Sequence, residues 1–203
     1  MTLMNFYKMT IVLALIHVAG TAFAVESQQI WEVSGTDAEG ASQVAHIVER
    51  RFKKIKPGFF DSVSAQANGN LVLLHFSGWR PTSKQLNALT QTTGKLCITL
   101  ASAPDQPLIT DKDIEQAEPL RTSEIAIRLS DSATLRVTAR TANAAEDVVV
   151  MQWDGQIIER LRIAAAPLQR DLAFSVPSRE DAQIMSAVLS SGRMPEGVSL
   201  KAR

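Results

Sequence analysis

The sequence predicts an α+β protein in which a ferredoxin-like (split βαβ) base is followed by a second small α+β head subdomain. Up to residue 100 the patterns run strand, helix, strand, strand, helix, strand, which is the order of a split βαβ unit. A second series of strand and helix patterns follows residues 101–107. That segment carries two prolines among small and polar residues, and we take it as a boundary.

The first part opens with a strand pattern at 28–33, where apolar and polar residues alternate. A helix follows and ends at Pro57-Gly58. Its apolar residues recur at helical spacing and form one stripe: Val44, Ile47, Val48, Phe52 and Ile55.

The most distinct local signal is Asn68-Gly69, a dipeptide that favours a two-residue hairpin turn, between strands expected at 63–67 and 71–76. The segment Thr82-Ser83-Lys84-Gln85 has the pattern of a capping box and opens the next helix. Residues 96–100 are expected to complete the sheet of the base.

In the second part, Thr110 and Asp113 resemble another capping box, so a short helix is expected through Ala117 until Pro119 stops it. Residues 124–129 alternate as a strand does. Residues 133–142 fit a strand or a helix equally, because their apolar residues alternate and also share a helical face.

Residues 148–153 predict a further strand, and Asp154-Gly155 turns it into a hairpin that returns through Ile157 and Ile158. A strand is expected at 172–176. Ser178 and the acidic residues after it cap a last helix, which Gly192 and Pro195 end.

Residues 1–24 have the pattern of an export signal. Lys8 precedes the apolar run Met9–Val18, and Ala22-Phe23-Ala24 offers a cleavage site after Ala24. The run is shorter than the roughly 20 residues that span a bilayer as a helix, so removal is favoured over retention as an anchor. The expected organisation is a signal peptide at 1–24, the base at 25–100 and the head at 101–203, in a periplasmic protein with no later membrane span.

Composition argues against several classes of partner. The 21 basic and 21 acidic side chains balance over 203 residues, so no global charge attracts nucleic acid or anionic lipid. Cys97 is the only cysteine, which excludes an intramolecular disulfide. It lies in an apolar run, and we expect it to be a small buried hydrophobe.

No residue pattern predicts catalysis, a cofactor or a metal. His46 and His75 have no partner at metal-ligand spacing, and no nucleophile elbow, phosphate loop or zinc helix motif occurs. Acidic pairs at Asp111 and Asp113, and at Glu180-Asp181, stand at helix starts, where negative charge is favoured. A non-enzymatic protein without catalytic, cofactor or metal residues is expected.

One concentrated charge remains, formed by five basic residues that could attract acidic polypeptide or anionic headgroups: Arg50, Arg51, Lys53, Lys54 and Lys56. Glu49 stands four residues before Lys53 and can pair with it on one helix face. That pairing favours a solvated helix face over a binding surface.

The segment from Ser178 to Pro195 resembles a pattern of the SecD family. In that pattern an acidic residue followed by alanine opens an apolar helix, and the motif Leu-x-x-Gly-x-x-Pro comes after it. Residues 108–117 are similar to the family's opening of its head subdomain, and 150–158 to its strand, Asp-Gly turn and strand. Weaker similarity at 47–52 and 70–78 extends the likeness over most of residues 43–200.

The resemblance implies an exported, SecD-like periplasmic domain that binds unfolded or translocating polypeptide, or Sec translocon subunits, and favours a helix at 133–142. Residues 158–162 depart from the family's Val-x-Ser-Ala-Pro, and the chain ends before the family's membrane helices, so energy transduction is not expected. The alternative is a stand-alone periplasmic interaction or structural protein with an unrelated partner. The sequence does not identify the residues that would bind polypeptide.

Overall fold

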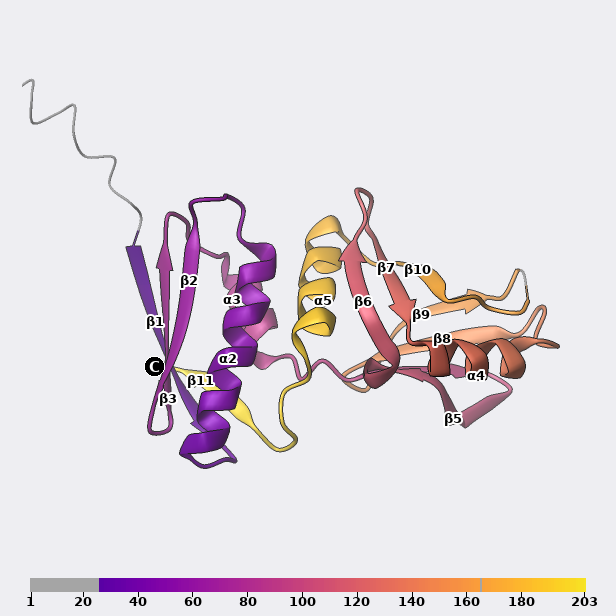
Figure 1. Ribbon diagram of the computed structural model, residues 1–203, viewed down its shortest axis with the longest axis horizontal. Helices are drawn as coiled ribbons and strands as arrows, with labels where there is room; N and C mark the ends of the chain where they lie inside the picture. The colour runs from indigo at the N-terminus through magenta and orange to yellow at the C-terminus, as the bar shows by residue number, and fades with distance from the viewer. Residues whose placement is uncertain (1–25, 165) are drawn as a thin grey trace, which may run out of the picture.

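The computed structural model describes residues 26–203 except residue 165, so the expected signal peptide and its cleavage site lie outside the described residues. Figure 1 shows an elongated molecule with one sheet at one end, two sheets at the other and helix α5 between them. We call the first sheet with its helices α2 and α3 the base, and the other two sheets with α4 the head. No helix among the described residues is long and apolar enough to cross a membrane.

The base sheet is antiparallel, and its strands are ordered β11-β1-β3-β2. Their bounds are Ser199–Ala202, Glu26–Ser34, Leu71–Ser77 and Ser62–Asn68. Asn68 pairs with Leu71, so the hairpin turn consists of Gly69 and Asn70, one residue later than expected. Gly69 takes the positive φ of 59° that this turn requires.

The fourth strand of the base is therefore β11 and not residues 96–100 as the sequence suggested. Strand β4 (Leu96–Leu100) forms as expected, but it pairs with β5 and β8 in the head. The expected division at residue 100 thus separates two strands that are hydrogen-bonded to each other. The local pattern indicates that a strand forms, but which strand it pairs with depends on contacts between segments distant in sequence. The split βαβ arrangement holds, with α5 and β11 completing it from the other end of the chain.

The head contains two sheets. A three-stranded sheet has the order β10-β7-β6, with bounds Asp171–Ser175, Glu124–Leu129 and Ile114–Pro119. A four-stranded sheet has the order β5-β4-β8-β9, and its other strands span Ala103–Thr110, Val148–Trp153 and Gln156–Arg162. The boundary expected at 101–107 is therefore partly strand, and its prolines are tolerated because β5 is an edge strand.

The expected helix at 110–117 is wrong beyond its first turn. The capping box of Thr110 and Asp113 is present, but it closes only a 3-10 turn, Asp111–Asp113, after which β6 begins. Asp113 accepts hydrogen bonds from the amide (2.8 Å) and hydroxyl (3.0 Å) of Thr110 and pairs with Arg136. Pairing of β6 with β7 overrides the local helix signal.

Residues 133–141 are helical, as the family resemblance favoured, and Ala142 follows as the C-cap. Helix α4 spans Asp131–Thr141, and the Ser130 side chain caps it by accepting from the amide of Ala133. Ala133 and Val137 are buried while Leu135 is 75% exposed. The buried side chains therefore follow the spacing of one helical face and not the alternation of a strand.

The other three helices form where the sequence placed them. Helix α2 spans Ala38–Ile55, α3 spans Ser83–Gln91 behind a complete capping box, and α5 spans Arg179–Ser191 behind the Ser178 cap. Residues Ile184, Ala187 and Val188 of α5 join the base core, whereas Ala182 and Met185 join the head core. One helix therefore supplies side chains to two separate hydrophobic cores.

Candidate functional site: the junction of base and head and the open sheet edge

The residues that the sequence considered for metal or covalent chemistry do not come together. His46 on α2 and His75 on β3 are both exposed, and within the described chain no three His, Cys, Asp or Glu residues are grouped to hold a metal ion. Cys97 is partly exposed rather than buried, because it lies on the face of β4 opposite Leu96 and Ile98, which face the core.

Three of the acidic residues, Asp113, Glu180 and Asp181, take part in capping or ion pairs. Asp181 accepts a hydrogen bond from the Ser178 hydroxyl at 2.6 Å and lies 2.7 Å from Lys84. Burial would raise the pKa of Asp181, but these two partners outweigh it and hold the pKa below its ordinary value. Glu180 also lies 3.5 Å from Lys84, so the pair ties α5 to α3.

The basic cluster does not form one surface. Lys53 pairs with Glu49, as expected, and Lys56 donates to the backbone oxygens of Phe59 (3.3 Å) and Asp61 (2.9 Å). Arg51 is completely buried. One feature of the sequence indicates the burial of Arg51, because Arg51 lies on the same stripe of α2 as Val44 and Val48.

The Arg51 guanidinium binds four backbone carbonyls between base and head. Nη1 donates to the oxygens of Leu89 (3.0 Å) and Thr92 (2.7 Å). Nη2 donates to those of Thr93 (3.3 Å) and Gly192 (3.2 Å). Burial lowers the pKa of Arg51 to about 10 against the opposing attraction of Asp154. Arg51 thus fixes both places where the chain passes between the base and the head.

Asp154 binds the first of these crossings from the head side. It lies in the turn between β8 and β9 with a positive φ of 48°. Its carboxylate accepts from the amides of residues 93 (3.0 Å), 94 (3.1 Å) and 95 (2.9 Å), and from the Thr93 hydroxyl. The sequence identified Asp154 only as a turn residue and missed this role.

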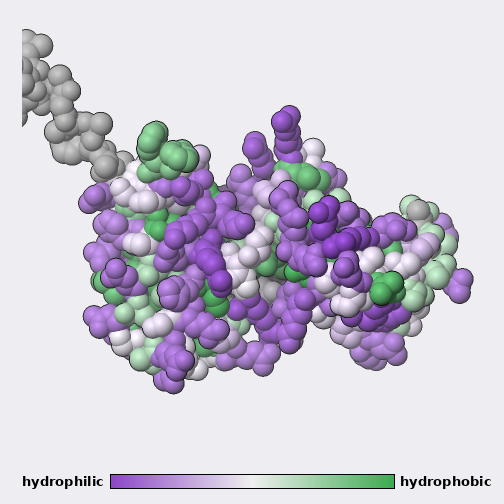
Figure 2. All heavy atoms as spheres, in the orientation of Figure 1, coloured by the Kyte–Doolittle hydropathy of each residue, from purple (hydrophilic) through white to green (hydrophobic). Residues whose placement is uncertain are grey.

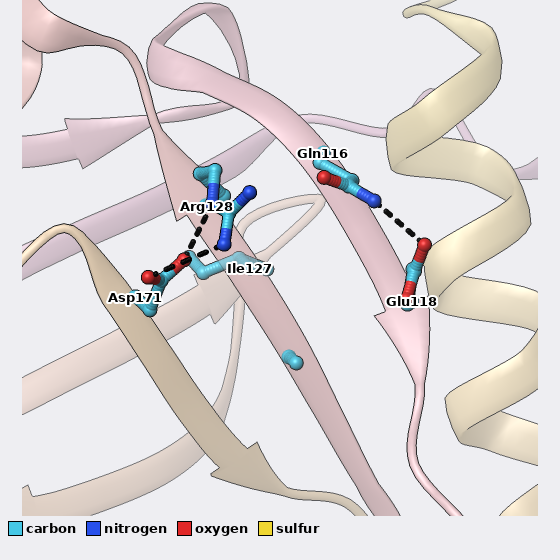
Figure 3. A pocket seen from close by; sticks show the side chains of 6 residues that line it. Gln116, Glu118, Ile127, Arg128 and Asp171 are labelled. Atoms are coloured by element: carbon cyan, nitrogen blue, oxygen red, sulfur yellow. Dashed lines mark hydrogen bonds and ion pairs between the residues drawn. The ribbon is translucent and has the colours of Figure 1, made fainter.

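The outer face of the three-stranded head sheet is shallow and polar (Figure 3). A hollow of about 150 Å³ is lined by Gln116, Glu118, Ala126, Arg128 and Asp171, among others. Arg128 Nε donates to Asp171 Oδ1 at 2.7 Å, and Gln116 donates to Glu118 at 2.6 Å. The hydrogen bond from Arg128 lowers the pKa of Asp171. These polar groups therefore hydrogen-bond to one another across the face.

The four-stranded head sheet has two different edges. Edge strand β5 carries Pro104 and Pro107, and Arg140 donates to the carbonyls of Gln106 (3.2 Å) and Pro107 (2.7 Å). Prolines and side-chain caps of this kind prevent strand addition. This edge is therefore closed to an added strand.

The opposite edge, β9, is open. In the part of the chain that the structure describes, no strand pairs with its outer side. The Arg160 amide is bound there only by the carboxylate of Glu159, at 3.1 Å. Ile157, half exposed, stands near the start of the strand. β9 is seven residues long, and alternate residues along it present their backbone amides and carbonyls outward, where an added strand would pair.

The architecture defines a class of protein: a split βαβ base with a two-sheet α+β head inserted between its third strand and its last helix. Solved structures of SecDF are similar to this architecture. A chain of "a membrane component SecDF that enhances protein export" matches 86% of this chain and 97% of its own length, with a TM-score of 0.60 and 12% identity.

SecDF "in Super-membrane-facing form" matches 86% of this chain with a TM-score of 0.65 and 14% identity, and the match covers 29% of that protein's length. No family model and no curated protein matches the sequence. At these identities the likeness is one of fold. The chain has the fold of these matched parts of SecDF, which confirms the SecD-like resemblance seen in the sequence.

Proposed function

We propose that this protein is a periplasmic accessory of protein export that transiently binds extended polypeptide along the open edge of β9. It acts without catalysing a reaction and without transducing energy by itself. The open edge carries this proposal. The shared fold supports the export context, since one of the matched proteins is described as enhancing protein export.

Strand addition suits a binder of many different polypeptides. An extended chain that pairs with a sheet edge is held mainly by its main-chain groups, so affinity depends little on its sequence. In β9 the Arg160 amide becomes available when the Glu159 carboxylate swings away, and Ile157 offers an apolar contact nearer the start of the same strand. Within the four-stranded head sheet, the protected β5 edge leaves β9 as the edge that can pair with an added strand.

The edge amide is tested by two substitutions at one position. Arg160→Pro removes the outward amide while the ladder to β8 keeps its neighbours, whereas Arg160→Ala removes only the side-chain charge. We expect the proline variant to lose binding of an unfolded secretory polypeptide, and the alanine variant to retain it, in a fluorescence anisotropy titration. Equal binding by both variants would rule out strand addition at β9.

The second candidate function is a stand-alone interaction protein with an unrelated periplasmic partner. It is favoured by residues 158–162, which replace the family's small residues and proline with a charged segment of β9. A photo-crosslinker in place of Ile157 distinguishes the two in cells. Sec translocon subunits or many exported chains support the export accessory, and a single unrelated protein supports the alternative.

A further inference from the structure

Two phenylalanines project from the loop between α2 and β2. Phe59 is 89% and Phe60 94% exposed, and their rings meet edge to face with centroids 5.4 Å apart. Figure 2 shows a hydrophobic projection at the end of the base, where Figure 1 places the loop between α2 and β2. Single exposed apolar side chains are common, but two almost bare aromatic rings at one loop tip mark an interaction surface.

The loop that carries the two rings is braced. Lys56 donates to the backbone oxygens of Phe59 and Asp61, which closes the loop on itself. Asp61 lies so close to Gly78 that a Cβ on that glycine would stand 2.5 Å from the Asp61 carboxylate. The aromatic tip is therefore presented by a supported loop next to the end of β3.

The position of the tip indicates what it meets. Ser77 pairs with Ser62, which follows the loop, and also with Glu26, where the described part of β1 begins. Figure 1 shows the start of β1 and the loop at the same end of the base. The 25 residues before Glu26 contain the apolar run Met9–Val18. Because the described chain enters β1 at this end, a bilayer that holds this run, before its removal or as a retained anchor, lies against the end that carries Phe59 and Phe60.

We propose that Phe59 and Phe60 dock the base end-on to a lipid bilayer. The rings enter the boundary between headgroups and acyl chains, where aromatic residues of peripheral proteins lie. Exposed Lys54, in the last turn of α2, faces water near the tip and adds attraction to anionic headgroups. This docking does not depend on polypeptide binding at β9, which lies in the head.

An environment-sensitive probe at the tip tests this in the full chain. A Phe60→Cys variant in a Cys97→Ser background is labelled with the fluorophore NBD and mixed with vesicles of phosphatidylethanolamine and phosphatidylglycerol. The matched control carries the label at Ile157→Cys, on an exposed apolar residue of the head. Phe60 is outside the core, so its replacement leaves the fold intact, which circular dichroism verifies.

We expect NBD emission at position 60 to rise several-fold and shift to the blue, with quenching by spin-labelled acyl chains, while position 157 stays unchanged. Phe59→Ser should reduce the rise at position 60. An unchanged signal at position 60 overturns the proposal. An equal rise at both positions, or a rise with unfolded polypeptide but not with vesicles, overturns it as well.

Discussion

Arg51 and Asp154 hold the segment 92–95 from opposite sides, Arg51 by its carbonyls and Asp154 by its amides. Arg51 comes from the base and Asp154 from the head. The Met194 amide also donates to the Thr93 carbonyl at 2.9 Å. This bond joins the segment that follows α5 to the segment 92–95. The orientation of base to head is thus set by hydrogen bonds to backbone, with one buried cation at the centre.

Replacing Arg51 with alanine should lower the free energy of unfolding by about 3 kcal/mol or more, because four carbonyls lose their buried donor. Chemical denaturation monitored by circular dichroism measures this. The neighbouring Arg50 is exposed, and Arg50→Ala should change stability by less than about 0.5 kcal/mol. Similar losses of unfolding free energy in both variants would show that the buried hydrogen bonds of Arg51 add no stability beyond that of an exposed arginine.

Replacing Asp154 with alanine should release the amides of residues 93–95 and raise their hydrogen exchange rates about tenfold or more, since hydrogen bonds to a charged acceptor contribute about 1.5–3 kcal/mol each. Asp154→Asn is the control, because asparagine tolerates the positive φ and keeps one acceptor. Its effect should be smaller. Unchanged exchange in the alanine variant would contradict the role of Asp154.

Gly94→Ala should destabilise the protein by about 2–4 kcal/mol. The φ of +86° strains an L-residue, and the added Cβ would lie 2.7 Å from Val188 Cγ1. Gly155 has a similar φ of +81° but nothing within 4 Å, so Gly155→Ala should show the backbone strain alone, about 1–2 kcal/mol. The difference between the melting temperatures of the two variants measures the cost of the contact between the added Cβ and Val188. Equal decreases in melting temperature would show that this contact costs nothing.

Acid should weaken the head through Asp113. Burial would raise the pKa of Asp113, but the hydrogen bonds from Arg136 and Thr110 outweigh burial and hold the pKa below 3.8. A lowered native pKa means that the ionised carboxylate contributes stability above pH 3.8, and that this contribution disappears as the pH falls through the native pKa.

Unfolding free energies of the wild type should therefore decline more steeply as the pH falls below about 5 than those of Asp113→Asn. Removal of the main partner by Arg136→Met should flatten the decline in the same way. An Asp113→Asn variant with the wild-type pH dependence would show that the ion pair contributes nothing measurable.

Most elements were predictable because their signals are local. The apolar stripe of α2, the capping box of Thr82 and Gln85, and the Ser178 cap each place a helix within one turn of the chain. Segments 114–119 and 133–142 were not settled in this way. For 114–119 the sequence predicted a helix, which pairing of β6 with β7 overrides, and for 133–142 the periodicity fits two structures, between which burial decides.

The candidate site was less predictable than the fold. Arg51 stood within a basic run that suggested a solvated face, and only its place on the apolar stripe signalled burial. Asp154 was read as a turn residue because its partners, at 93–95, are about 60 residues away in sequence. The openness of β9 depends on which strands fail to pair with it, which no single segment encodes.

The sequence by itself determined the α+β class, most helix bounds and the SecD-like resemblance, since these depend on hydrophobic periodicity and on short capping and turn motifs. Tertiary structure alone decided that β11 rather than β4 completes the base, that Arg51 and Asp154 meet over residues 92–95, and that Phe59 and Phe60 remain bare. The physical reason is that strand pairing and burial are contacts between segments distant in sequence.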